Sequence, residues 1–296
     1  MSVSSRFSQF LDNIQLTDNQ LSSGVTCRES VVGCLNAAYY GTSSFSANSL
    51  SVGSWGKFTR IRPPRDVDVL FRLPDTTYNR FQQRAGNKQS QLLQEVRGHL
   101  QLSFSSTKIR GDGPIVLVPF SAFSVEVIPA FRLTNDRYYV CMTDKGGYYK
   151  TADYDAEIKH IADSDTATKK NTRALIRMMK YWQGYWSVEI KSFWIELTAV
   201  SFLQQWQYAD KSMTYYDWMV RDYLAYLVRQ KNTYVFAPGT YETMYLGDEW
   251  ESKAISALER AKKAVEFENL ATPQPYNAGD EWQKIFGTDM PRVPNG

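Results

Sequence analysis

The sequence predicts an α+β protein of two lobes, in which a mixed α/β lobe is followed by a helical lobe. The length of 296 residues is about twice that of an average domain, so two lobes are expected. Strand-like alternation gathers between residues 66 and 142, whereas helical periodicity dominates from about residue 165 onward. We therefore expect a first lobe at 1–164, a helical lobe at 165–270 and a C-terminal arm at 271–296.

The elements of the first lobe follow from local signals. Thr17 and Gln20 form a capping-box pattern, which predicts a helix that runs to Tyr40. The prolines and arginine at 63–65 then interrupt the chain before an alternating strand at 66–71. Leucine and valine recur at helical spacing within 77–102, and a turn is expected at 110–114. Three strand-like runs follow, at 115–120, 123–128 and 138–142.

The helical lobe is predicted from four periodic segments, at 166–184, 190–208, 214–230 and 248–268. The tail carries several prolines around one short amphipathic piece at 281–286, so we expect a wrapping or exposed arm.

Composition excludes several classes of protein. Hydrophobic residues at 43% and charged residues at 22% exclude a disordered or low-complexity chain. The apolar runs are too short to cross a membrane and no signal-peptide pattern is present, so we expect a cytoplasmic protein without a membrane partner. A net charge of +3 does not by itself indicate a nucleic-acid binder. Few thiols and imidazoles are available for disulfide frameworks, zinc sites or histidine triads: Cys27, Cys34, Cys141, His99 and His160.

Two carboxylates share one face of the predicted strand at 66–71. Successive side chains of a strand point to opposite faces, so Asp66 and Asp68 project together while Val67, Val69 and Phe71 point into the core. Two unpaired carboxylates on a buried strand repel each other and lose hydration, so they need a cation.

The pattern of two acids separated by one residue is not specific. About three such pairs are expected by chance in a chain of this composition, and the pairs at 153/155 and 163/165 are examples. The apolar, β-branched neighbours of Asp66 and Asp68 distinguish this pair from the others.

Glu126 lies between apolar positions of another predicted strand and is a third carboxylate for the same site. Three carboxylates on one sheet face would form an oxygen site for one or two Mg²⁺ ions, with Mn²⁺ as the alternative. The competing interpretation is that these acids lie at strand edges and face water.

Phosphate-binding candidates lie on both sides of this strand. Gly53 and Ser54 offer close backbone approach and a hydroxyl, although a plain turn is the preferred explanation if they are taken without the carboxylates. Arg173, Arg177 and Lys180 form a basic stripe along a predicted helix, for which a solvated face is the alternative.

A further helix opens with a hydroxyl and two aromatic rings. Ser192 is followed by Phe193 and Trp194, which suit either base stacking or core packing.

The order and spacing of Gly53-Ser54, Asp66-x-Asp68 and Glu126 resemble the active-site pattern of the polymerase-β-like nucleotidyltransferases. Residues 174–182 and 190–196 resemble the helical lobe of the cGAS/DncV-like branch (CD-NTases), whose bacterial members make cyclic oligonucleotide signals in antiphage (CBASS) defence. The resemblance covers nearly the whole chain. It implies a bilobal nucleotidyltransferase with a mixed β-sheet catalytic lobe, a helical C-terminal lobe and a long N-terminal helix that bridges them.

The resemblance also implies a role for each candidate. Asp66, Asp68 and Glu126 would be catalytic metal ligands, and Gly53 with Ser54 would hold the donor triphosphate. Lys180 and Arg177 would contact phosphate, while Ser192 and Phe193 stand where the family has a hydroxyl and a base-stacking ring. Many relatives carry Asp where this chain has Glu126, which reaches further by one methylene group but is the same type of ligand. Relatives often carry Tyr where this chain has Phe193, so a base stacked here would lose any contact with a phenolic hydroxyl.

The activity implied is Mg²⁺-dependent transfer between NTPs, with ATP expected among them, that releases pyrophosphate and closes a cyclic di- or trinucleotide. No nucleic-acid template is expected, because no nucleic-acid reading module is recognisable. An ancillary protein of the defence operon is expected to act on the C-terminus at Gly296. Two alternatives stay open, namely a nucleotidyltransferase that acts on an RNA end or a protein, and a non-catalytic module that binds RNA or nucleotides.

Overall fold

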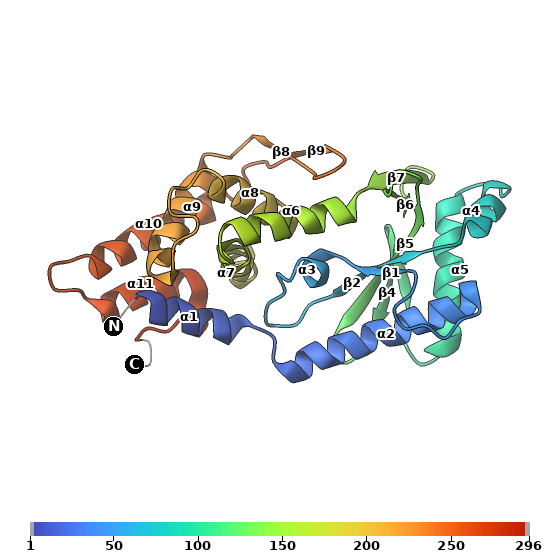
Figure 1. Ribbon diagram of the computed structural model, residues 1–296, viewed down its shortest axis with the longest axis horizontal. Coiled ribbons are helices and arrows are strands. Elements are labelled where there is room, and N and C mark those ends of the chain that lie inside the picture. Colours follow the sequence, from blue (N-terminus) through green and yellow to red (C-terminus); the bar gives the residue numbers. More distant parts are fainter. Residues whose placement is uncertain (1–2, 294–296) are drawn as a thin grey trace. The chain divides into compact units, whose positions relative to one another are not determined.

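The structure is a computed structural model that describes residues 3–293 (Figure 1). The chain forms two compact units. The helical unit consists of the residues up to Gln15, the short segment Ile61–Pro63 and the chain from Lys159 onward. The sheet unit consists of Leu16–Arg60 and Pro64–Ile158.

The sheet unit is built on a mixed seven-stranded sheet. Strands β1 to β5 lie in the order β1-β2-β5-β4-β3, and β6 pairs with β5 and β7. Only the β2–β5 pair is parallel among the described strand pairs of this sheet. The strands are β1 (Ser49–Ser51), β2 (Val67–Arg72), β3 (Arg110–Asp112), β4 (Ile115–Pro119), β5 (Ser124–Arg132), β6 (Tyr138–Met142) and β7 (Tyr148–Ala152).

Helices α2 (Asp18–Tyr40) and α5 (Lys88–Ser103) pack against this sheet (Figure 1). The predicted capping box is confirmed, because the Thr17 side chain accepts a hydrogen bond from the Gln20 backbone and the Gln20 side chain accepts one from the Thr17 backbone. The larger core of the unit lies against these helices. It includes alternate side chains of β2, namely Val67, Val69 and Phe71, as predicted.

The other side chains of β2 and β5 face a smaller apolar cluster. Leu70 and Ile128 are register partners and lie in this cluster with Val52 and Val140. Because side chains alternate along a strand, Asp68 and Glu126 share this second face with Leu70 and Ile128. Two short helices complete the unit, α3 (Gly53–Gly56) and α4 (Asp75–Gln82).

The helical unit packs its helices around one large core that contains Trp182, Trp250 and Trp282. Helix α6 begins in the sheet unit and ends in this one. The helices are α1 (Val3–Ile14), α6 (Tyr154–Ala167), α7 (Asn171–Tyr185), α8 (Ser192–Leu203), α9 (Tyr216–Val228), α10 (Glu251–Glu268) and α11 (Pro275–Phe286), with the 3-10 turns η1 (Met213–Tyr215) and η2 (Gly287–Asp289). A hairpin of β8 (Tyr234–Phe236) and β9 (Thr243–Tyr245) is added to them.

The units differ from the expected boundaries at both ends of the chain. The predicted helix that runs to Tyr40 is confirmed as α2, and the shorter helix α1 before it was not predicted. Helix α1 belongs to the helical unit, because Phe7 packs on Trp282 and Phe10 packs on Phe286. The segment after residue 270 is not an exposed arm in its described part, since α11 packs against α10 and buries Trp282 and Phe286.

Three predicted elements also need correction. The helix expected at 77–102 is two helices, α4 and α5, and the segment 166–184 spans the end of α6 and most of α7. Residues 110–112 form strand β3 rather than part of a turn. In the two helical cases one periodic pattern continues across a short break that the periodicity does not reveal, whereas the exposed residues of β3 have turn-like preferences.

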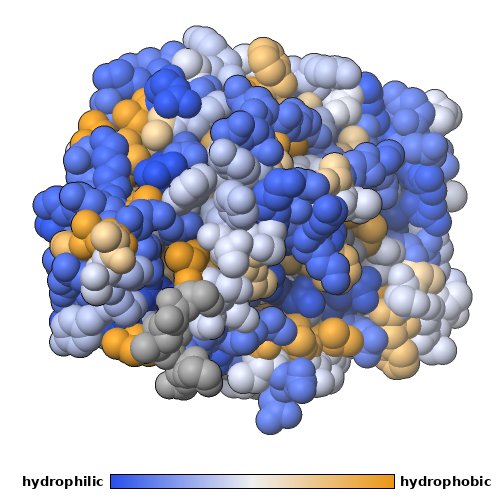
Figure 2. All heavy atoms as spheres, turned by 60° about the vertical axis from the view of Figure 1, so that its left-hand side comes forward, coloured by the Kyte–Doolittle hydropathy of each residue, from blue (hydrophilic) through white to orange (hydrophobic). Residues whose placement is uncertain are grey.

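No helix within residues 3–293 combines the length and the apolar character that a membrane span requires. Figure 2 shows a mainly hydrophilic face on which hydrophobic residues form small separate groups.

Candidate active site

Asp68 and Glu126 lie side by side on the central parallel strands β2 and β5. They are register partners, and their side chains are hydrogen bonded. Both are half-buried, whereas Asp66 precedes β2 and is exposed. Burial raises the pKa of Glu126 to about 7, and the negative charges of Asp66 and Asp68 add to this effect. The sheet therefore places these carboxylates close together, where they repel one another when all are ionised.

The donor set at this position suits a divalent cation. Carboxylate oxygens are the ligands that Mg²⁺ and Mn²⁺ prefer, and a nearby cation would favour the ionised form that burial disfavours in Glu126. Asp68 and Glu126 form the paired part of the predicted triad. Within residues 3–293, no three His, Cys, Asp or Glu side chains are grouped to hold a metal ion, so the pair does not extend to a closed set with Asp66.

Gly53 places the backbone of α3 directly against Asp68. The Val52 amide donates a hydrogen bond of 3.1 Å to the Asp68 carbonyl oxygen, which joins the two segments. Gly53 has a φ of 53°, and a Cβ atom at this residue would overlap the Asp68 carboxylate. Glycine is thus required both for the backbone conformation and for the close approach. Ser54 follows in the single turn of α3 and is half-buried.

Three polar residues near this pair were missed from the sequence. Lys57 is buried, and its Nζ lies 2.8 Å from Glu157 Oε2. Tyr154 has a raised pKa, mainly because it is buried and also because Glu157 and Asp68 are negative. Local sequence patterns could not predict the contact between Lys57 and Glu157, because 100 residues separate them.

Asp112 is a fourth carboxylate that adds negative charge at Glu126. It lies on β3, and its charge contributes to the raised pKa of Glu126. Register places Arg110 opposite Leu117, and Leu117 opposite Glu126, so Arg110 and Asp112 share the face of Glu126. The turn-like sequence around Gly111 concealed this strand.

In the helical unit, Lys180 and Glu196 form an ion pair between α7 and α8. Their Nζ and Oε1 atoms are 3.6 Å apart, and the two side chains are only 7% and 4% exposed. A solvated helix face, the alternative left open for the basic stripe, is therefore wrong at Lys180. A buried charge of this kind is costly unless it is paired or binds a charged ligand.

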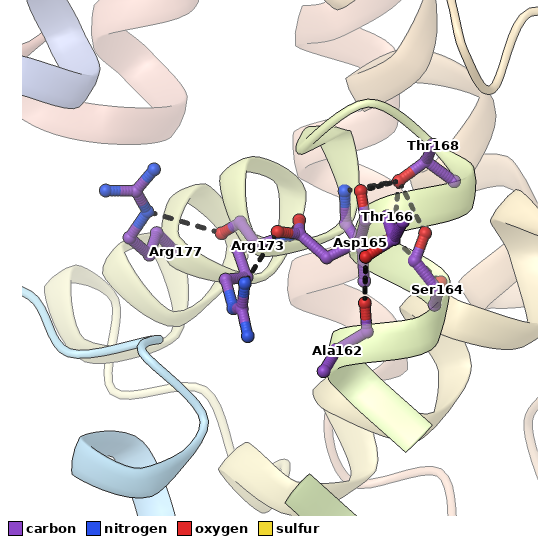
Figure 3. A network of polar contacts seen from close by, with 8 residues as sticks. Ala162, Ser164, Asp165, Thr166, Thr168, Arg173 and Arg177 are labelled. Carbon is purple, nitrogen blue, oxygen red and sulfur yellow. Dashed lines mark hydrogen bonds and ion pairs between the residues drawn. The ribbon is translucent and has the colours of Figure 1, made fainter. Parts of the chain in front are cut away.

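The other two members of the stripe interact with each other and with α6 (Figure 3). Arg173 Nη1 lies 2.8 Å from Asp165 Oδ2, and the Arg173 amide donates to Asp165 Oδ1. Arg177 Nε donates to the Arg173 carbonyl oxygen over 3.3 Å. Burial lowers the pKa of Arg177, an effect that the nearby Tyr216 opposes.

The start of α8 is held by α7. Ser192 Oγ donates a hydrogen bond of 3.0 Å to Gln183 Oε1, and Phe193 is half-buried beside it. Lys191 Nζ lies 4.9 Å from the centre of the Trp194 ring, and Trp194 packs against the core. Core packing therefore accounts for Trp194, whereas Phe193 is partly buried and does not belong to that core.

The candidates thus divide between the two units. Gly53, Ser54, Asp66, Asp68 and Glu126 lie in the sheet unit, and Arg177, Lys180, Ser192 and Phe193 lie in the helical unit.

Residues 1–165 match the Second Messenger Oligonucleotide or Dinucleotide Synthetase domain, abbreviated SMODS. The chain belongs to the SMODS family. This SMODS chain is 21% identical over 279 residues to the probable cyclic nucleotide synthase IK1_05630 of Bacillus cereus strain VD146, covering 82% of each protein. The resemblance to the cGAS/DncV-like nucleotidyltransferases is confirmed.

Solved structures of other proteins share the fold of this SMODS chain. CdnC of Escherichia coli MS115-1, solved with ATP, matches with a TM-score of 0.71 at 17% identity over 98% of this chain and 99% of that one. DncV of Vibrio cholerae in its apo form matches with a TM-score of 0.73 at 12% identity over 98% and 96%. The expected α+β nucleotidyltransferase fold with a mixed sheet and a helical part is thus confirmed.

Proposed function

We propose that this protein is a nucleotidyltransferase that joins NTPs, ATP among them, into a cyclic di- or trinucleotide with the help of Mg²⁺ or Mn²⁺. Membership of the SMODS family supports this synthesis, as does the likeness to the probable cyclic nucleotide synthase of Bacillus cereus. The observation that carries the proposal is the side-by-side placement of Asp68 and Glu126 on two parallel strands.

Each residue of the sheet unit has a proposed role in the transfer. Asp68 and Glu126, with Asp66 beside them, would hold the divalent cation, which neutralises phosphate charge during in-line attack on the α-phosphorus and departure of pyrophosphate. Glu126 is the carboxylate that we place nearest the attacking ribose hydroxyl, whose proton an ionised carboxylate at this position could accept. Gly53 lets backbone amides approach the donor phosphates, and the Ser54 hydroxyl donates to them.

The residues of the helical unit have proposed roles in nucleotide binding. Lys180 and Arg177 would contact phosphate, and both are restrained, by Glu196 and by the Arg173 carbonyl oxygen. Ser192 would donate to the nucleotide in place of its hydrogen bond to Gln183, and Phe193 would stack on a base, a contact that contributes roughly 1–3 kcal/mol.

The biological setting is also part of the proposal. We place the enzyme in the cytoplasm, in antiphage defence, working without a nucleic-acid template. CdnC of Escherichia coli has been solved in a complex with HORMA-deltaN, and by analogy we expect an ancillary protein partner here. The proposed action of such a partner on Gly296 lies outside the described residues.

The decisive experiment is mass spectrometry of the products formed from all four NTPs with Mg²⁺, with Mn²⁺ and with EDTA. Phosphatase-resistant cyclic products that require a divalent cation are expected. Transfer of label to an RNA end or to a protein would support the first alternative. Tight, salt-dependent binding without pyrophosphate release, under activating conditions, would support a non-catalytic module.

A further inference from the structure

The helical unit contains a cavity of about 450 Å³ that none of the proposed active-site residues lines. It lies among α7, α10 and α11. Its volume is within the range of small-molecule sites, roughly 300–1,000 Å³. The cavity is thus large enough for a ligand with one ring system and one charged group.

Two tryptophans supply the apolar wall of this cavity. Trp182 is buried, whereas Trp186 is 46% exposed and presents its ring. Trp186 Nε1 donates a hydrogen bond of 2.9 Å to the Ile285 carbonyl oxygen, which holds the indole in place. A fixed, half-exposed indole is a preorganised platform on which a planar ring can stack.

The rest of the lining is cationic and hydroxylic. Lys253, Arg260 and Lys284 contribute three positive charges. Glu281 is paired with Arg260 at 3.2 Å and with Lys284 at 2.5 Å, so three cations and one carboxylate leave a net charge of two positive units. Hydrogen bonds from these two cations lower the pKa of Glu281 although burial works to raise it, which keeps the carboxylate ionised.

Donors are available to a ligand from the start of α10. Lys253 Nζ donates to the carbonyl oxygens of Trp186 and Ser187, which accounts for two of the three N–H groups of an ammonium. Ser252 and Ser256 add hydroxyls to the lining. Ser252 and Lys253 lie in the first turn of this 18-residue helix, where the helix dipole also favours an anion.

We propose that this cavity binds a nucleoside phosphate, with the base on Trp186 and the phosphate at the cations and hydroxyls. A phosphate monoester carries close to two negative charges at neutral pH, which matches the net charge of the lining, whereas a single carboxylate matches only half of it. The inference rests on the cavity alone and does not depend on the proposed function. It would be a second nucleotide site, apart from the residues proposed for the active site.

The test is calorimetric titration of AMP in EDTA, because AMP lacks the triphosphate that the proposed active site holds. Ser256 is exposed at the cavity, so Ser256→Trp fills it without entering the core. AMP affinity should fall at least tenfold in this variant and roughly tenfold in Arg260→Gln, which removes one charged partner. Lys263→Gln, an exposed change on the same helix outside the lining, is the control and should bind AMP as the wild type does.

Further arms of the titration separate this inference from the proposed function. The Asp66→Ala, Asp68→Ala double variant should keep its AMP affinity, and adenosine or inorganic phosphate alone should bind more weakly than AMP. Absence of AMP binding to the wild type, or AMP affinity in Ser256→Trp and Arg260→Gln equal to that of the wild type, overturns the proposal. Circular dichroism verifies folding, and Lys284→Gln replaces Ser256→Trp if the latter does not fold.

Discussion

Asp68 and Glu126 are register partners on adjacent parallel strands and are joined by a hydrogen bond between their side chains. Half-buried carboxylates in this arrangement repel each other, and burial with that repulsion raises the pKa of Glu126 to about 7. An arrangement that disfavours the folded state without a cation is typical of a functional site rather than of a structural one.

Replacing Asp68 by Asn should separate activity from stability. Asn keeps the shape and can donate a hydrogen bond to Glu126, so thermal stability should be unchanged or rise, by about 1 kcal/mol at neutral pH. Product formation should fall at least 100-fold, roughly 3 kcal/mol in the barrier, because a cation ligand is lost. Melting curves and product assays on the same preparation measure both effects.

Asp163→Asn is the matched control for this change. Asp163 belongs to a similar pair of acids but lies exposed beside Lys159. It should leave activity intact. A marked loss of stability in Asp68→Asn, or near-normal activity, would contradict the proposed site.

A methyl group at Gly53 should disturb both fold and activity. Gly53→Ala combines a left-handed φ with overlap of the new Cβ and the Asp68 carboxylate. We expect a loss of about 2–3 kcal/mol in the free energy of unfolding, together with loss of most product formation. Urea denaturation and a product assay test this.

Gly41→Ala separates strain from overlap. Gly41 has a similar φ of 63°, ends α2 and has open space where a Cβ would lie. It should lose about 1 kcal/mol and keep its activity. If Gly53→Ala lowers activity no more than Gly41→Ala does, Gly53 is needed only for its backbone conformation and not for the close approach to Asp68.

Local signals in the sequence predicted the parts of the site that depend on neighbouring residues. The alternation of side chains along a strand predicted that Asp68 points to the face opposite to that of Val67 and Val69. The capping box predicted that α2 begins after Thr17. These features arise within one strand or one helical turn, so a single sequence displays them.

Features that depend on distant packing could not be predicted in this way. The position of α1 is decided by contacts of Phe7 with Trp282, which lies at the other end of the chain. Similarly, the spacing on α7 revealed a basic stripe, but the partner of Lys180 comes from α8. Asp112 was hidden because a short exposed strand and a turn share the same residue preferences.

Removal of the Lys180 charge should destabilise the helical unit. Lys180→Met leaves Glu196 buried without this partner, and such a change costs about 3–5 kcal/mol in the free energy of unfolding. The double change Lys180→Met with Glu196→Met should recover most of that stability, because both charges are replaced by apolar chains of similar size.

The kinetic result distinguishes a structural pair from a phosphate-binding lysine. If Lys180 contacts phosphate, the stable double variant should still show a raised KM for NTPs. A double variant with normal KM would limit Lys180 to a structural role. Lys159→Met, which breaks an exposed ion pair with Asp163, is the control and should change neither property noticeably.

Asp217 should make the stability of the protein depend on pH. It lies in the first turn of α9 and is 3% exposed, and its Oδ1 has no hydrogen-bond partner among the described residues. Burial raises its pKa to about 6, with a further contribution from the charge of Glu268. In the unfolded chain an aspartate has a pKa of about 3.9, so the folded state holds a proton that the unfolded state releases between these two values.

Stability should therefore fall as the pH rises from about 4 to about 6 and then level off, as far as this group is concerned. Asp217→Asn removes the charge at every pH, so it should stabilise the protein by about 1–3 kcal/mol at pH 7.5 and have almost no effect at pH 4. Urea denaturation of both proteins at pH 4, 5, 6 and 7.5 measures the difference, with the exposed Asp136→Asn as the control. A difference that grows toward low pH would show that the Asp217 carboxylate is ionised and stabilising, because its pKa would then be lowered by folding instead of raised.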